Sequence, residues 1–107
     1  KTARAIGVAS APLPALPGAR WDVLVQATPA GRNGEEVLHR RHLGGLVVLD
    51  AAYGAEPTPL VVAARARGLA VVDGFDLLAA QAALQFERLT GRPAPSEAMA
   101  SALEPWR

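Results

Sequence analysis

Three positions carry groups that could contact a ligand: the phenol of Tyr53, the backbone of Gly74 and the amide of Gln81. The Gln81 amide offers a pair of donors and an acceptor, which suits a polyhydroxylated ligand. A glycine such as Gly74 lets a ligand approach the backbone N–H and C=O with no Cβ in the way. The sequence shows no serine nucleophile with a nearby base, so these groups indicate ligand binding.

Each of these residues also has a purely structural explanation, and the pattern alone leaves both open. Gly74 fits a tight turn between a strand and a helix, and Tyr53 fits a half-buried packing residue whose hydroxyl reaches water. Gln81 lies among alanines and leucines, so we expect it on the buried side of a helix, bonded either to a loop backbone or to a ligand. A buried amide without a partner would cost about 1–3 kcal/mol.

Metal binding and acid–base chemistry have less support. His39 and His42 have an i,i+3 spacing that could hold a metal ion on one helical turn, but no third ligand stands out. The run of basic and titratable side chains around them predicts a solvated surface, so no metal site is expected. Asp50 and Asp73 each end an apolar run without an evident catalytic partner, and no glycine-rich phosphate loop is present.

The elements that must position these groups begin with three short apolar runs, Trp21–Thr28, Gly45–Tyr53 and Leu69–Gly74. They are rich in valine and leucine and do not alternate with polar residues. Such runs are typical of strands buried on both faces, as in a parallel sheet covered by helices.

Helices are predicted after the second and third runs. Thr58–Gly68 has Thr58 as its N-cap, proline at its first position and glycine at its end. Asp76–Gly91 is predicted with Asp76 as the N-cap and Gly91 as the C-cap, and Ser96–Arg107 begins with a serine cap. The alternation of strand and helix predicts an α/β fold built from right-handed parallel units.

Three further segments give weaker signals. Lys1–Gly7 resembles the last turns of a helix closed by a glycine. A short edge strand is considered near Gly7–Ser10, although the three prolines that follow forbid a long regular element. Gly34–His42 is expected to form one or two helical turns.

Parallel strands bring their carboxyl-terminal loops to one edge of the sheet, where ligands of open α/β sheets bind. That edge would collect residues 28–31, 51–53 and 74–76. Gln81 follows Gly74 by about two helical turns, so we expect it to lean over the same edge.

The composition narrows the classes of partner. A chain of 107 residues is enough for one domain, and a net charge of +1 gives no basic field for nucleic acid or an anionic membrane. The absence of cysteine excludes disulfides and thiolate metal sites and fits a reducing cytoplasm. No signal peptide or membrane-spanning run is visible. Because the chain opens with Lys1, we expect it to be a piece of a longer protein or a processed product.

Three segments, read together, resemble the closing part of the shikimate dehydrogenase family. They are QATPAG, then LDAAYGAEPTPLVVAARARG, then VVDGFDLLAAQAALQFERLTGR, in the family's order and spacing between about Trp21 and Gly91. The chain departs from the family's usual residues at four positions, namely Gln26, Arg32, Asp76 and Leu77.

The resemblance implies an oxidoreductase that reduces 3-dehydroshikimate to shikimate with NADPH, in the shikimate pathway of aromatic amino-acid biosynthesis. It implies that Tyr53 and Gln81 contact the small-molecule substrate. It also implies that Gly74 and the backbone of Ala51 contact the nicotinamide, and that Thr28 borders the NADP cofactor. The implied fold is a partial Rossmann-like (doubly wound) parallel sheet of three to four strands flanked by helices.

On this resemblance, residues 1–107 form a single domain, the carboxyl-terminal portion of an NADP-binding domain. The family's catalytic lysine and aspartate and its phosphate loop precede the segment that these residues match, so we expect no catalytic residue here and no activity of the isolated chain. Three alternatives remain. One is a non-catalytic module that pairs through an open strand edge beside Trp21–Thr28, with another copy or with the absent amino-terminal part. Another is a relative that uses quinate, and the third is one end of a fused multi-step polypeptide of the same pathway.

Overall fold

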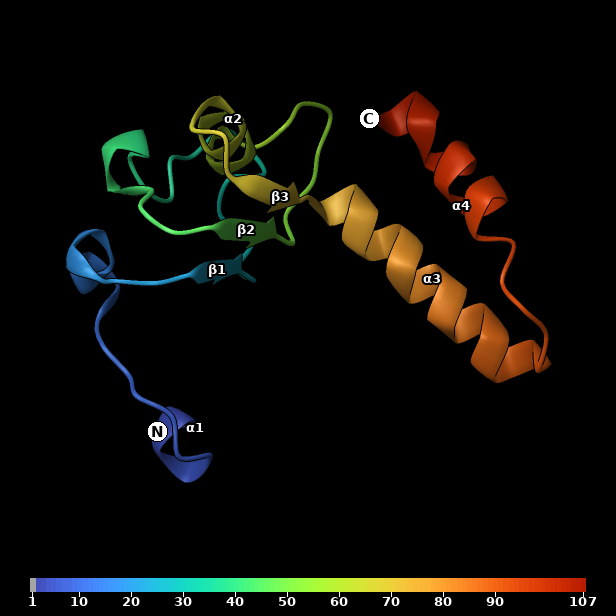
Figure 1. Cartoon of the computed structure of the whole chain (residues 1–107), viewed down its shortest axis with the longest axis horizontal. Helices are drawn as coiled ribbons and strands as arrows, with labels where there is room; N and C mark the ends of the chain where they lie inside the picture. Colours follow the sequence, from blue (N-terminus) through green and yellow to red (C-terminus); the bar gives the residue numbers. More distant parts are fainter. Residues whose placement is uncertain (1) are drawn as a thin grey trace.

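The structure, a computed structural model, describes residues 2–107 and contains a three-stranded parallel sheet (Figure 1). Strand β1 (Val23–Gln26) pairs with β2 (Val47–Asp50), which pairs with β3 (Ala70–Val72). The strands lie in the order in which they occur in the sequence. The predicted α/β fold with a parallel sheet is therefore confirmed, with three strands.

Helix α2 (Pro59–Ala66) covers one face of this sheet and begins and ends as predicted. The Thr58 hydroxyl caps it by accepting the N–H of Val61 at 3.2 Å, and Gly68 has a φ of +75° just beyond its end. The core consists of buried side chains from this helix, from β2 and from the segment before β2, namely Leu38, Leu43, Val48, Leu60 and Ala64.

The other face of β1 is open, so the expected burial of the strands on both faces is wrong for this strand. Val23 and Val25 point away from the core side and remain 56% and 59% exposed. Leu24, which alternates with them, packs against the core. The reason is that α2 covers one face of the sheet, and no helix among residues 2–107 buries these two valines.

The segment before the sheet does not form the strand considered near Gly7–Ser10, and that prediction is wrong. Helix α1 (Thr2–Ala5) ends at Gly7, whose φ is +74°, and the N–H of Val8 then donates to the carbonyl of Ala3 at 3.0 Å. This agrees with the predicted glycine stop, although Lys1 lies outside the described residues. A 3-10 helix, η1 (Leu13–Gly18), follows and contains two of the prolines.

The N-cap of helix α3 (Gly74–Thr90) lies three residues before the predicted one. Asp73 is the N-cap, and its carboxylate accepts the N–H of Asp76 at 2.9 Å, while the Asp76 carboxylate accepts the N–H of Asp73 at 3.1 Å. This reciprocal capping box places Gly74 inside the first helical turn. The expected cap at Asp76 is therefore wrong, whereas the expected end at Gly91, with φ +66°, is confirmed.

Helix α4 (Ser96–Leu103) runs back beside α3 and ends in a short 3-10 helix, η3 (Glu104–Trp106), near the beginning of α3 (Figure 1). The predicted serine cap is wrong, because Pro95 occupies the cap position and makes no side-chain cap bond. In the segment 34–42 the structure forms one turn, η2 (Arg40–His42). No helix in the described part of the chain has the length and apolar character needed to cross a membrane.

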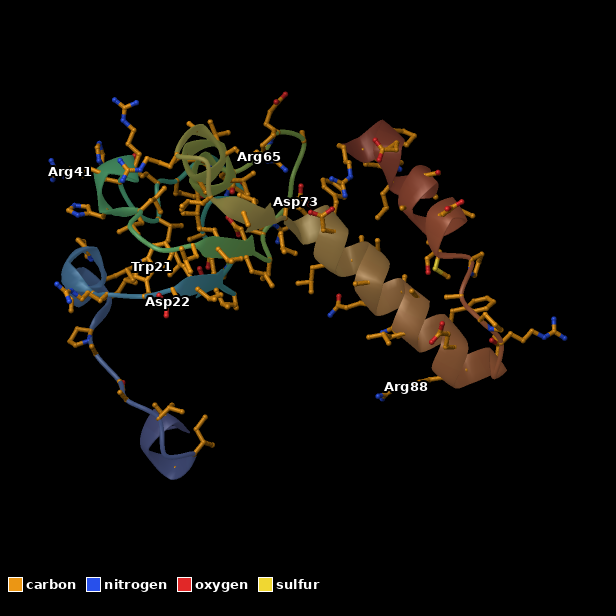
Figure 2. All side chains as sticks on the ribbon, in the orientation of Figure 1. Trp21, Asp22, Arg41, Arg65, Asp73 and Arg88 are labelled. Carbon is orange, nitrogen blue, oxygen red and sulfur yellow. The ribbon has the colours of Figure 1, made fainter. Side chains whose placement is uncertain are left out.

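Arg107 joins the end of the chain to the start of α3. Its guanidinium donates to the carboxylate of Asp76 at 2.6 Å and to that of Asp73 at 3.3 Å, and it lies 5.8 Å from the ring centre of Phe75. Arg65 of α2 also donates to Asp73, at 3.0 Å, and Figure 2 shows these two residues at the junction of β3 and α3. The pair of arginines therefore connects α2, α3 and the segment after α4.

The pKa of Asp76 is lowered by these contacts. Burial raises it, but the hydrogen bond from Arg107 and the backbone N–H of Asp73 outweigh burial. A lowered carboxyl pKa means that the stabilisation is present above the ordinary value of 3.8 and is lost as the pH falls through the lowered value.

We expect Arg107→Ala to raise the pKa of Asp76 toward its ordinary value, because the largest favourable partner of the carboxylate is removed. NMR titration of the Asp76 carboxyl group measures this shift directly. Arg92→Ala, which removes an exposed arginine after α3, should leave the titration unchanged. An unaltered Asp76 pKa in Arg107→Ala would contradict the contact.

Candidate functional site

The loops after the three strands meet at one edge of the sheet, as the parallel order requires. A pocket of about 210 Å³ is lined by Thr28 from the loop after β1 and by Ala51 and Tyr53 from the loop after β2. A second pocket, of about 220 Å³, is lined by Tyr53 together with Gly74 at the start of α3. The structure therefore brings four of the five predicted site residues to the same edge.

The fifth, Gln81, lies on α3 and is exposed, so the expectation of a buried amide is wrong. It lines neither of these two pockets. Seven residues separate it from Gly74, and seven residues complete almost two turns, so both lie on the same side of α3 about 10 Å apart along its axis. The neighbouring leucines misled the prediction because Leu84 is itself exposed and Leu77 is only half-buried.

Tyr53 and Gly74 are packed against each other. A Cβ on Gly74 would lie 2.7 Å from Cδ1 of Tyr53 and 2.9 Å from the carbonyl oxygen of Ala52, so only glycine fits. The Tyr53 ring also contacts Phe75, with ring centres 5.1 Å apart, yet the residue stays 43% exposed. Packing accounts for the glycine, while the exposed part of the tyrosine remains available to a ligand.

A third pocket, of about 500 Å³, is also lined by Tyr53 and reaches α3 and α4. Its lining comes from the loops after β1 and β2, from α3 and from the end of the chain: Arg32, Tyr53, Gly54, Ala55, Phe75, Leu78, Leu103 and Trp106. Tyr53 is thus shared by all three pockets.

A buried carboxylate holds the loop after β2. Asp50 is fully buried, and its Oδ2 accepts the hydroxyl of Thr58 at 2.7 Å. Its Oδ1 accepts the N–H of Ala52 at 2.9 Å and the amide of Gln26 at 3.4 Å. Since Thr58 also caps α2, the negative charge lies at the amino end of that helix, where the helix dipole favours it. Every buried oxygen of this group therefore has a donor, as a buried charge requires.

Gln26 extends the same network into the loop after β1. Its Oε1 accepts both the N–H and the hydroxyl of Thr28 at 2.6 Å, and its Nε2 donates to the carbonyls of Thr28 at 3.1 Å and Ala30 at 2.8 Å. The position of Thr28 in its pocket is thus set by a side chain that stood out in the sequence only as a departure from the family's usual residue. The available signal was a polar residue at the end of an apolar strand.

Glu35 closes the far side of this loop. Its carboxylate accepts the N–H of Gly31 at 2.9 Å and that of Asn33 at 3.1 Å, and Gly31 has a φ of +93°. Hydrogen bonds from its own backbone N–H and from those of Asn33 and Gly31 lower the pKa of Glu35. The loop is therefore bonded at both ends.

The two histidines take part in local contacts instead. Nδ1 of His39 accepts a hydrogen bond from the backbone N–H of Arg41 at 3.2 Å. Nε2 of His42 accepts one from the Nε–H of the Arg41 side chain at 3.1 Å. Within residues 2–107 no three histidine, aspartate or glutamate side chains are grouped in a way that could hold a metal ion.

A family model, curated relatives and solved structures all match this chain to the same family. Residues 74–104 match the family model of the shikimate 5'-dehydrogenase C-terminal domain. The shikimate dehydrogenase (NADP(+)) of Natronomonas pharaonis is 44% identical over 84 residues, which cover 77% of this chain and 32% of that protein. That of Maricaulis maris is 39% identical over 77 residues, covering 69% and 28%.

Solved structures extend the match to the whole chain. The shikimate 5-dehydrogenase of Thermus thermophilus, in complex with NADP(H) and shikimate, superposes with a TM-score of 0.81 at 28% identity, covering 98% of this chain and 41% of that one. The shikimate dehydrogenase of Mycobacterium tuberculosis superposes with a TM-score of 0.62 at 38% identity, covering 87% and 34%.

The chain belongs to the shikimate dehydrogenase family. It spans about a third of the length of the curated shikimate dehydrogenases that it matches. Its sheet and helices have the Rossmann-like α/β arrangement of the solved family members, which confirms the predicted fold class.

Thr58→Val tests the network that positions the loops. The change removes the helix cap and leaves one oxygen of the buried Asp50 without its donor, so we expect the free energy of unfolding to fall by about 2 kcal/mol. Ser101→Ala is the control, because Ser101 is exposed, has no side-chain hydrogen bond to a described residue and should change stability by less than about 0.5 kcal/mol. Urea unfolding of both variants makes the measurement, and equal stabilities would exclude the role given to Thr58.

Proposed function

We propose that residues 1–107 form the carboxyl-terminal portion of the NADP-binding domain of a shikimate dehydrogenase, a single domain that works with a substrate domain. The reaction is the reduction of 3-dehydroshikimate to shikimate with NADPH. The observation that supports it most is the shared edge, where the loops carrying Thr28, Ala51, Tyr53 and Gly74 meet around adjoining pockets. A cytoplasmic location stays a prediction.

The residues at the edge fit the nicotinamide end of the cofactor. Three of the seven residues that line the pocket beside Thr28 are alanines, Ala27, Ala51 and Ala52, whose small side chains leave room for a flat ring. We assign Thr28, Ala51 and Gly74 to the cofactor, whose nicotinamide supplies the hydride when bound. The Thr28 hydroxyl is held by Gln26 at 2.6 Å, so its position is fixed before a ligand arrives.

We assign Tyr53 and Gln81 to the substrate. The phenol lies between the pockets, and the Gln81 amide is exposed on the same side of α3 as Gly74. An exposed amide with no hydrogen bond to another described residue can give its donors and acceptor to hydroxyl or carboxylate groups. The choice of shikimate over quinate depends on how many such groups the ligand presents to it.

The contribution of this chain to catalysis is positional. Asp50 is enclosed by donors, and Asp73 and Asp76 are paired with Arg65 and Arg107, so none of these three carboxylates is free to transfer a proton. Holding two reactants in register is worth several kcal/mol of the barrier, yet it supplies neither acid nor base. We therefore infer that the purified 107-residue chain has no NADPH-dependent turnover.

Gln81→Ala, made in the complete dehydrogenase, should lower kcat/KM for shikimate about 10- to 100-fold, because a hydrogen bond to the bound ligand is lost. Stability should not change, since the side chain is exposed. Gln85→Ala, one turn further along α3, is the matched control and should keep the original kcat/KM. If the two variants have equal steady-state kinetics, Gln81 does not contact the substrate.

A second function, that of an assembly module, is favoured by the open side of β1. Val23 and Val25 are exposed on a strand at the edge of the sheet, and such edges pair with other chains. The partner would be a second copy of this chain or the amino-terminal part of the enzyme.

Light scattering combined with NADPH titration separates the two functions. An assembly module should be a dimer that ignores nucleotide, and Val23→Lys with Val25→Lys should make it monomeric. Val62→Lys, at an exposed valine of α2, is the control and should leave the dimer intact. A monomer that binds NADPH contradicts the module and favours the dehydrogenase portion.

A further inference from the structure

Arg32 is held at the ligand edge by its backbone. It follows the loop after β1, and its N–H donates to the carbonyl of Pro29 in a turn at 3.5 Å. Its own carbonyl oxygen packs on the loop after β2, where a Cβ on Gly54 would approach it to 3.3 Å. The guanidinium therefore extends from a backbone that contacts two of the three loops.

Arg32 is an exposed residue that lines two of the pockets that share Tyr53, the one with Thr28 and the larger one that reaches α3 and α4. In each of them it is the one charged residue of the lining. The walls of the larger pocket are otherwise apolar or aromatic, with Phe75 and Trp106 facing the same space.

Arg32 also differs from the other arginines at this edge. Arg65 and Arg107, which line the neighbouring pocket, are both paired with Asp73. No carboxylate among residues 2–107 forms an ion pair with Arg32 (Figure 2 shows the separate Arg65–Asp73 pair). An exposed arginine that lines an aromatic-walled pocket and forms no ion pair has its charge and its donors available for a ligand.

We propose that Arg32 binds an anionic oxygen group of the ligand held beside Tyr53. A guanidinium binds carboxylate or phosphate through two parallel N–H···O bonds, and neither lysine nor an amide reproduces that geometry. The larger pocket, of about 500 Å³, is in the range of small-molecule sites and suits a compact ring acid. This inference rests on the proposed function, and it makes Arg32 a specificity-determining residue for it.

Two anions are available in the proposed reaction: the carboxylate of shikimate and the phosphates of NADPH. Arg32→Gln in the complete dehydrogenase removes the charge and keeps a polar side chain of similar length. Steady-state kinetics give the KM for shikimate, and fluorescence titration gives the Kd for NADPH. The matched control is Arg88→Gln, because Arg88 lies near the far end of α3, away from the pockets (Figure 2).

If the carboxylate is bound, Arg32→Gln should raise the KM for shikimate about tenfold and leave the Kd for NADPH unchanged. The methyl ester of shikimate should then be a poor ligand of the original enzyme and should lose nothing further in Arg32→Gln. If a phosphate is bound, the Kd for NADPH should rise about tenfold instead, with the larger effect at low salt. Arg32→Lys should bind the anion better than Arg32→Gln but less well than the original enzyme, since lysine has the positive charge but cannot form the two parallel hydrogen bonds of a guanidinium.

Equal values of KM and Kd in Arg32→Gln and Arg88→Gln would overturn the inference while leaving the proposed function intact. An original enzyme that binds neither shikimate nor NADPH would instead remove the proposed function itself. The two failures are therefore distinguished by the unsubstituted protein.

Discussion

The ligand edge of this chain depends on one buried negative charge. Asp50 has no exposed surface, and its oxygens are satisfied by donors from three separate segments: β1, the loop after β2 and the cap of α2. Because a buried carboxylate is costly unless each oxygen is bonded, those segments are required to approach one another. The carboxylate fixes where the loops leave the sheet.

The residues that hold the loops in place differ from the residues that have polar atoms free for a ligand. Gln26, Asp50 and Thr58 use their polar atoms on each other and on backbone groups, so they hold the loops and have little left for a ligand. Tyr53 and Arg32 are carried by those loops and keep polar atoms free. Rigid polar support behind exposed ligand groups is the arrangement expected of a preorganised site. Family membership and local hydrogen bonding therefore lead to the same edge.

Much of the fold could be predicted because its signals are local. The three apolar runs became strands, and Gly68 and Gly91 end helices with positive φ, as residues without a Cβ do most easily. Convergence of the loops at one edge followed from the parallel order alone.

The errors involve contacts that sequence spacing does not specify. Asp73 and Asp76 are both suitable caps, and the choice depends on where β3 ends. Gln81 was expected to be buried because its neighbours are apolar, but burial depends on what packs against α3. The exposed face of β1 was missed for the same reason. An apolar run shows that a strand is hydrophobic, but it does not show whether a helix covers each face of that strand. Arg32 became informative only when its lack of an ion pair could be seen.

The tight fit of Gly74 against Tyr53 has a mechanical consequence. Gln81 lies about 10 Å along α3 from that contact, so a tilt of about 10° at the first turn would move the amide by about 2 Å, roughly the difference between a hydrogen bond and none. A Cβ at this position would collide with Tyr53 and shift the start of the helix, whereas glycine allows the close contact. If Gln81 contacts the substrate as proposed, the accuracy of that contact is decided where the helix leaves the sheet.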